Sequence, residues 1–485
     1  MTSASCLSIS REEIRIAYAQ GEEAVIELVE TRFNALVARL EALENQLKQD
    51  SQNSSKPPSS DGFTKRTKSL RSPSECPSGG QIGHPGSTLE WNSEPTHVEI
   101  HPVLSCQGCG KSLVNVPLDS WDNRQVHDLP RVQVEVTQHQ CEVKCCPKCG
   151  KLSRGNFPST VKRQVQYGVN VQALTMYLMV VQLIPSLRIC ELFSEAFGLS
   201  LSEGTIYNIR QRCFKGLETS SQQIKSALHL SEVVHYDETG FRVGSKLWWL
   251  HVGCTDELTF YFVHTKRGRV AMDAMGLLPG FTGTALHDGL RSYGQYDCLH
   301  GLCNAHHLRE LRFIVECFKQ VWAQEMFDLL TQMNQEVKAA KQEGATALEP
   351  ARITALEQLY GEILDRGFKA NPALLIPENA PKAKGRPKQS KAKNLLDRLK
   401  LQQESVLRFI HDFRVPFDNN QAERDIRMMK LKQKISGCFR SESGAQMFCR
   451  IRGYVSTVRK QGDSAFNGFI QLFMGHPVSP IPKAE

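Results

Sequence analysis

Three acidic residues occur in sequence contexts that could place them around a divalent metal ion. Asp237 in VVHYDETGF and Asp288 in TALHDGLRSY each close an apolar run typical of a strand, whereas Glu423 lies in the charged helical pattern FDNNQAERDIRMMK. Mg²⁺ binds a few carboxylate oxygens and keeps its other positions for water and phosphate. Two such ions about 3.5–4 Å apart can stabilise both the attacking and the leaving oxygen of a phosphodiester. The ordered set therefore predicts nuclease or transposase chemistry, although each residue alone is more typical of a helix cap or a solvated surface.

Residues 231–310 contain the strands that must position the two aspartates. VVHYDETGFRV, KLWWLHVGC, LTFYFVHT and GTALHDGL alternate or run apolar, and RGRVAMDAMGLL between the third and fourth predicts a helix. Three strands, a helix and a fourth strand is the order of an RNase-H-like fold, in which the first and fourth strands lie side by side. We therefore expect Asp237 and Asp288 to be close. His235 and His287 flank them, and we expect both histidines to point away from the carboxylates.

The segment that must supply Glu423 follows a long insertion. We predict a helical insertion with a basic loop over 311–415, a catalytic helix that completes the core over 416–435, and a C-terminal helical region over 436–485. The basic loop PKAKGRPKQSKAKNLLDRLK is typical of a solvated face, but beside a nuclease centre phosphate contact is comparably expected.

Three residues near these motifs are open to a second interpretation. Asp418 precedes Glu423 by little more than one helical turn, so it is a rival for the third acidic position. Cys303 and His306 form a C-x-x-H pair just after a strand. This pair is more typical of a packed cysteine and a polar or DNA-facing histidine than of half a metal site.

Residues 95–160 carry a strong metal-binding signal. Two C-x-x-C-G turns, each able to hold one edge of a tetrahedral Zn²⁺, flank VQVEVTQHQCEVK, whose alternation predicts a strand. We therefore predict a zinc ribbon with a β-hairpin between its two knuckles, which stabilises a small domain and presents it to nucleic acid. Cys141 and Cys145 remain unassigned. The four predicted ligands are Cys106, Cys109, Cys146 and Cys149.

Residues 161–225 predict helices, and SLRICELFSEAFGLSLSEGTIYNIRQRCFK gives a helix, a glycine turn and a second helix. One interpretation is a helix-turn-helix whose recognition helix carries Arg210, Arg212 and Lys215. A helical pair packed against a core explains the pattern equally well.

The N-terminal segments predict self-association followed by a linker. In residues 22–48 apolar side chains recur every seven residues, from Ile26 to Leu47, which specifies a coiled coil more readily than a helix folded onto its own domain. Residues 49–92 are rich in Ser, Pro, Gly and Lys, so we expect a disordered basic linker.

Composition sets the broad class. A chain of 485 residues with 40% hydrophobic side chains and a net charge of +8 predicts several domains and only a mild basic excess. The 16 cysteines accompany no secretory start, and the longest apolar run, 169–184, is too short and too polar to span a membrane. We expect a cytoplasmic protein with α+β and α/β domains and no membrane partner.

Several of these motifs together resemble one family over most of the chain. The segments SSKPPSSDG, GGQIGHPG, the paired CxxCG, YDETGFRV, HDGLRSY, CNAHHLREL and DNNQAERDIR are similar to those of the insertion sequence 66 (TnpC-type) transposases. The resemblance implies a bacterial DDE transposase with an RNase-H-like core, in which Asp237, Asp288 and Glu423 are the catalytic acids and bind Mg²⁺ or Mn²⁺. Because Glu423 belongs to the matching AER segment, it is preferred to Asp418.

The resemblance also implies partners. Terminal inverted repeats and target DNA would be bound with help from the ribbon and the helical region before the core, in a homo-oligomer joined through the coiled coil and with accessory proteins of the same element as further candidates. The basic side chains that we expect to contact DNA are Arg210, Arg212, Lys215, Lys382, Lys384, Arg386, Lys388, Arg424, Arg427 and Lys430.

Two other classes remain open. A repressor or an inactive transposase remnant would use the same DNA-binding elements without catalysis, and the intact acidic set argues against it. An RNase-H-like nuclease would keep the acids, but the long N-terminal array argues against that class.

Overall fold

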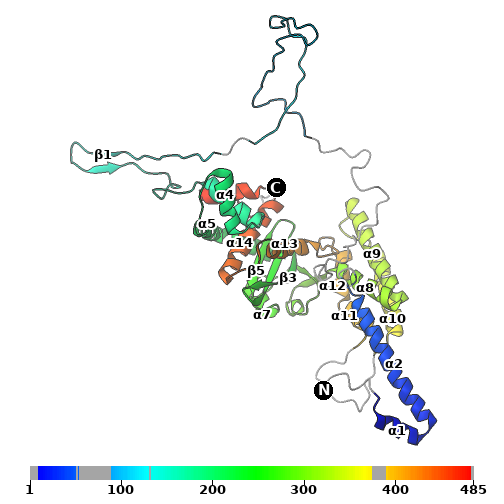
Figure 1. Ribbon diagram of the computed structural model, residues 1–485. Coiled ribbons are helices and arrows are strands. Elements are labelled where there is room, and N and C mark those ends of the chain that lie inside the picture. The colour runs from blue at the N-terminus through cyan, green and yellow to red at the C-terminus, as the bar shows by residue number, and fades with distance from the viewer. Residues whose placement is uncertain (1–8, 51–52, 54–88, 130–132, 374–388, 482–485) are drawn as a thin grey trace.

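The protein combines helices with a central sheet, and its N-terminus is helical (Figure 1). The computed structural model describes residues 9–50, 53, 89–129, 133–373 and 389–481. The largest ordered part consists of a sheet with helices on both faces and a group of helices beside it.

The five strands of the sheet have the order β5-β4-β3-β6-β7. β3 pairs antiparallel with β4, and β4 with β5, whereas β3–β6 and β6–β7 are parallel. Gly244 at φ 57° lies in the tight turn between β3 and β4, a conformation that side chains with a Cβ rarely adopt. The strands are β3 Val233–Val243, β4 Lys246–Cys254, β5 Thr259–His264, β6 Thr284–His287 and β7 Leu299–Leu302.

One strand boundary differs from the expectation that Asp237 closes its strand. β3 continues to Val243 because all of β4 pairs with residues 235–243 of β3. The parallel partner β6, in contrast, pairs only with residues 233–235. Asp237 therefore lies in the middle of β3, just beyond the point where the parallel pairing ends.

Alternation along the strands produces two buried faces. Phe241, Val252 and Val263 pack on one face against α13, α14 and the helices around them. Val234 and Tyr236 pack on the other face against α6 and α7. These helices are α3 Val169–Met176, α5 Glu203–Gly216, α6 Glu218–His229, α7 Arg269–Met275, α13 Asn420–Ser436, α14 Glu442–Lys460 and α15 Ala465–Met474, with the π-helical turn Tyr177–Val181 after α3 and the 3-10 turn Tyr293–Gln295 before β7.

The predicted helical pair exists and packs on this core. α4 (Ser186–Phe197) ends at Gly198, which has φ 63°, and the side chain of Ser202 caps α5. Ile209 and Cys213 of α5 are buried against α3, α14 and α15. One face of α5 is thus part of the core, as in the second of the two interpretations.

The insertion is a helical unit with a hydrophobic core of its own, and its first helix begins at Asn304, before the predicted boundary at 311. Leu311, Trp322, Leu330 and Tyr360 are among its buried residues. The basic-loop residues Lys382, Lys384, Arg386 and Lys388 lie outside the described residues. The helices are α8 Asn304–Phe318, α9 Val321–Gln342, α10 Pro350–Ala370, α11 Lys391–Leu401 and α12 Gln403–His411.

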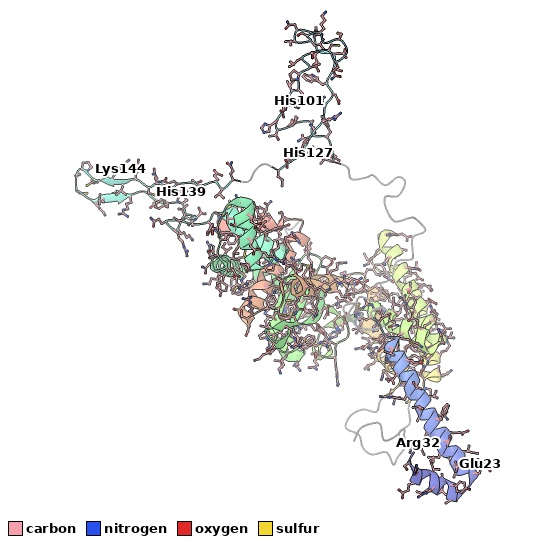
Figure 2. The ribbon with its side chains drawn as sticks, viewed as in Figure 1. Glu23, Arg32, His101, His127, His139 and Lys144 are labelled. Atoms are coloured by element: carbon pink, nitrogen blue, oxygen red, sulfur yellow. The ribbon has the colours of Figure 1, made fainter. Side chains whose placement is uncertain are left out.

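The N-terminal helices form a hairpin in which the apolar repeat faces water. α1 (Arg11–Gln20) packs on α2 (Glu22–Leu47), and Arg32 pairs with Glu13 at 2.7 Å. Figure 2 shows Arg32 and Glu23 on this hairpin. Phe33 is 63% and Leu47 81% exposed, so the coiled coil stays a prediction. Of the predicted linker 49–92, the structure describes only the two ends and Asn53. The side-chain amide of Asn53 donates to Glu316 of α8 at 3.1 Å.

Residues 95–160 form less regular structure than predicted. The strand expected across VQVEVTQHQCEVK is wrong for residues 133–142, which are exposed apart from Cys141 and belong to neither of the two described sheets. The ladder instead joins β1 (Val143–Cys145) to β2 (Leu152–Arg154), on either side of the second cysteine pair. An isolated strand has no hydrogen-bonding partner for its backbone, so only the short hairpin that closes on itself forms.

Candidate active site

Asp237 is held by β3 on the face that α13 covers. Its side chain shares this face with Phe241, four residues along the strand, while Glu238 points to the opposite face. The backbone N–H of Glu238 donates to Asp237 Oδ1 at 2.7 Å. The sheet and this hydrogen bond thus fix the position of the first carboxylate.

Asp288 directly follows β6, the parallel neighbour of β3. A chain of three hydrogen bonds fixes the turn that carries it: Gly289 N donates to His287 Nδ1 at 3.0 Å, His287 Nε2 contacts His300 Nδ1 at 3.1 Å, and His300 Nε2 contacts the Tyr296 carbonyl at 3.2 Å. Because Gly289 N and the Tyr296 carbonyl have fixed roles, both rings are neutral, with Nε2 as the donor. Burial accordingly lowers the pKa of His287 to about 3.

Glu423 lies in the first turn of α13, which Asn419 fastens to the sheet. The backbone N–H of Asn419 donates to Cys303 Sγ at 3.2 Å, and its side-chain amide donates to the Tyr236 carbonyl at 2.8 Å. Asp418 precedes the helix and accepts from the N–H of Asn420 at 3.1 Å. Glu423 is among the charges that act on Asp237.

The three acids come together as like charges. Burial first, then Asp288, Glu238 and Glu423, raise the pKa of Asp237 well above its usual value. Burial and then Glu238 raise the pKa of Asp288 to about 6. On its own face, Glu238 pairs with Arg267 at 2.9 Å and accepts a hydrogen bond from the Tyr293 hydroxyl at 2.8 Å. Mutual repulsion of this kind is what a cation between the carboxylates would relieve.

Two side chains from α8 border the acids. His306 Nε2 lies 3.4 Å from Asp288 Oδ2, and an Arg309 nitrogen lies 3.9 Å from Glu423 Oε1. Glu423 Oε1 is buried and has no hydrogen-bond partner among the described residues. Neither Arg309 nor Asn419 was singled out from the sequence, although both lie in the motifs CNAHHLREL and DNNQAERDIR.

The position of His235 corrects one expectation. His235 was expected to point away from the carboxylates, but residues two apart on a strand share a face. Its Nδ1 donates to Asn419 Oδ1 at 2.9 Å, so it supports the start of α13 beside Asp237. His287 does lie on the other face, stacked on Tyr293 with ring centroids 4.4 Å apart.

A buried polar group holds the rest of α13 in register. Asp425 Oδ2 pairs with Lys460 Nζ of α14 at 2.7 Å and accepts from the Thr259 hydroxyl of β5 at 3.1 Å. The Tyr261 hydroxyl donates to the Asp425 carbonyl at 2.8 Å. These contacts tie the glutamate-bearing helix to the far edge of the sheet.

Comparison with known protein families identifies the family to which this chain belongs. Residues 164–447, more than half of the chain, match the family model described as Transposase IS66 family. The chain belongs to the IS66 transposase family. Residues 8–90 match a second model, described as a family of unknown function (DUF6444). No curated protein matches the chain.

The cysteine pairs of this IS66-family chain form two separate knuckles. Gly110 at φ 76° and Gly150 at φ 69° close the two turns, and each donates its N–H to the carbonyl of the first cysteine. Backbone N–H groups, led by those of Cys109 and Cys149, lower the pKa of Cys106 and Cys146.

The four cysteines do not converge as the predicted zinc ribbon requires. Among the described residues, Asp288, Cys303 and His306 form a group of three metal-ligating side chains whose ligand atoms all lie within 4.8 Å of one another. The cysteines of the two knuckles form no such group there. Figure 2 shows His101 and His127 on one projection and His139 and Lys144 on another. Each knuckle is a local turn, whereas joining them requires long-range packing that this exposed segment lacks.

The predicted DNA-contacting residues of the IS66-family chain differ in exposure. Arg212, Lys215, Arg424 and Arg427 are exposed, whereas Arg210 is half-buried over the Tyr207 ring. Lys430 donates to the Gly240 carbonyl at 2.5 Å, which ties it to β3. Within the described residues, no helix is both long enough and apolar enough to cross a membrane.

Proposed function

We propose that this chain is the DDE transposase of a bacterial insertion sequence, which binds the element ends and catalyses DNA cleavage and strand transfer. The observation that carries the proposal is the convergence of Asp237, Asp288 and Glu423, with one buried Glu423 oxygen that has no hydrogen-bond partner in the described part of the chain. Family membership supplies the general activity, and the carboxylates supply its mechanism.

The sheet supports an RNase-H-like core. Its first strand is central, its second and third follow antiparallel on one side, and its fourth and fifth lie parallel on the other. This order puts Asp237 beside the turn that follows β6, and α13 adds the glutamate from the face that it covers.

The carboxylates fit divalent Mg²⁺ or Mn²⁺ because hard cations prefer oxygen ligands and relieve repulsion among neighbouring carboxylates. When bound, such ions supply Lewis-acid catalysis of phosphodiester cleavage and transfer. The chain's own part is orientation: β3 holds Asp237, the histidine-fixed turn holds Asp288, and Asn419 holds the start of the helix that carries Glu423. Arg309 and Arg427, 3.9 and 3.5 Å from Glu423, add positive charge beside a phosphate site.

The other predicted elements serve DNA binding and assembly in this proposal. Each cysteine knuckle offers two thiols, and backbone N–H groups lower the pKa of the first one, Cys106 or Cys146, which suits structural Zn²⁺ once both pairs meet. The exposed apolar stripe of α2 suits a coiled coil between two copies. The exposed basic residues of α5 and α13 suit phosphate contacts, and accessory proteins of the element remain candidates as partners.

Substitution of the acids tests the proposal. Asp237→Asn, Asp288→Asn and Glu423→Gln should each lower Mg²⁺-dependent cleavage of an element-end duplex on the order of a thousandfold, because each removes a charge that holds the cation. Asp418→Asn is the matched control, since this neighbouring carboxylate precedes α13 and should keep near-normal cleavage. Retained cleavage in any of the three variants would remove that residue from the site.

The products separate the alternatives. Joining of the cut end to target DNA is expected of a transposase, whereas cleavage without joining identifies a nuclease. Binding of the duplex without any cleavage identifies a repressor or an inactive remnant.

A further inference from the structure

A histidine from the insertion lies next to the second aspartate. His306, in the first turn of α8, puts Nε2 3.4 Å from Asp288 Oδ2. Two ligand atoms that each lie roughly 2.0–2.2 Å from one ion are roughly 3.0–3.5 Å apart, depending on the ligand angle. The observed separation is therefore what two neighbouring ligands of a single ion would show.

The geometry around the His306 ring places Nε2 at the acidic site. Nε2 faces Asp288 Oδ2, and an Arg309 nitrogen lies 3.5 Å from it on the side of Glu423. The other ring nitrogen, Nδ1, is buried and has no hydrogen-bond partner among the described residues. The ring therefore meets its polar surroundings through Nε2, the atom that lies beside the carboxylate.

The neighbouring cysteine has a different role. The Cys303 side chain is buried, and its Sγ accepts the N–H of Asn419 at 3.2 Å, just before α13. A soft sulfur that already accepts a hydrogen bond is a poor ligand for a hard cation. The cluster of Asp288, Cys303 and His306 therefore offers one oxygen and one nitrogen ligand.

We propose that His306 Nε2 is a further ligand of the divalent cation that Asp288 holds. The inference rests on the proposed function, because it takes Asp288 as a metal ligand. A nitrogen ligand in an oxygen site increases the preference for Mn²⁺ or Co²⁺ over Mg²⁺. It also gives the insertion a direct part in the catalytic centre, since α8 is its first helix.

Mn²⁺ bound to the full-length protein provides a readout independent of activity. Electron spin echo measurements should detect ¹⁴N coupling from a coordinated imidazole in the wild type and lose it in His306→Ala. His306→Ala and the closer-sized His306→Gln should weaken Mn²⁺ binding about tenfold or more, and Mg²⁺ binding by a smaller factor. His411→Ala is the matched control, because His411 is also an insertion histidine beside a carboxylate, Glu357, at 2.9 Å. It should bind Mn²⁺ like the wild type.

Three results would overturn the inference: no ¹⁴N coupling in the wild type, coupling that persists in His306→Ala, or equal loss of Mn²⁺ and Mg²⁺ affinity in the variants. The wild-type spectrum needs no substitution, so a variant that fails to fold does not prevent the test. The failure of the proposed function looks different, since Mn²⁺ binding would then be insensitive to Asp237→Asn and Asp288→Asn.

Discussion

The carboxylates around Asp237 and the cysteine pairs of residues 95–160 are both predicted metal sites. In the fold the carboxylates lie close together, whereas the two cysteine pairs lie apart. The carboxylates come from two neighbouring strands and a distant helix, yet they lie close enough for their charges to interact. The knuckles each close correctly on a glycine but remain separate. Spacing within a motif specifies a local turn, whereas a site that joins distant segments needs packed elements to carry its parts.

The packing around the two regions explains the contrast. α13 and α14 bury apolar side chains against the sheet, and the Asp425–Lys460 pair fixes their register. In residues 95–160 the apolar side chains of Val98, Trp121 and Val136 are mostly exposed. Little hydrophobic burial is available there to offset the entropy lost when the two knuckles meet.

The largest expected effect on stability comes from breaking the Asp425–Lys460 ion pair, which joins α13 to α14. Lys460→Met leaves Asp425 charged and unpaired where both side chains are only 12% exposed, so it should lower the free energy of unfolding of the core by about 3–5 kcal/mol. Urea denaturation measures the loss. Mn²⁺ affinity should fall with it, whereas zinc content of the knuckles should not change.

A double substitution tests the cause of that loss. Asp425→Asn with Lys460→Met removes both charges and should recover much of the stability, because no buried charge is left without a partner. If the double variant is no more stable than Lys460→Met alone, the ion pair is not what holds α13.

A smaller change in the free energy of unfolding is expected when the pH rises from about 4 to 7. The pKa of Asp288 is about 6 in the folded chain against its usual 3.8, so its proton is bound more tightly in the folded than in the unfolded state. The stability that this proton confers is complete below about pH 4 and is lost as the pH rises through about 6, in a chelator that keeps metal away. Because the side chain is 29% exposed, the loss should be roughly 1–2 kcal/mol.

Asp288→Asn serves as the reference for this measurement, since an amide does not titrate. The stability of the variant relative to the wild type should increase between pH 4 and 7 in metal-free buffer. A constant difference across this range would show that Asp288 does not carry the raised pKa.

The smallest effect on the core is expected from the cysteines. Cys106→Ser with Cys109→Ser, or Cys146→Ser with Cys149→Ser, should change the unfolding free energy of the sheet by less than about 0.5 kcal/mol. If both pairs share one ion, either double variant should lose all bound zinc in metal analysis. Retention of half the zinc by each would mean that the knuckles bind separately, and a large loss of core stability would contradict the separation of the two regions.

Much of the sheet could be predicted because its strands alternate and are separated by clear turns. The closeness of Asp237 and Asp288 then follows from pairing of the first and fourth strands. That β3 runs on past Asp237 did not follow, because its length is set by β4, the antiparallel partner, and not by its own apolar run.

The position of Glu423 depends on contacts between residues far apart in the sequence, which no local sequence pattern predicts. Glu423 is positioned through Asn419, which reaches His235 and Tyr236, nearly two hundred residues earlier in the chain. His306 and Arg309 border the acids only because α8 returns to the sheet edge. Such contacts are made by tertiary packing, so family resemblance rather than periodicity pointed to the glutamate.

The position of α13 after the insertion has a consequence for synthesis. Both aspartates leave the ribosome before α8–α12, and the glutamate, its capping asparagine and Lys460 follow only afterwards. A growing chain therefore holds no complete carboxylate set until its last helices are made. A product that stops within the insertion keeps both aspartates but lacks the helix that carries the third acid, so under the proposed function it would not cut DNA.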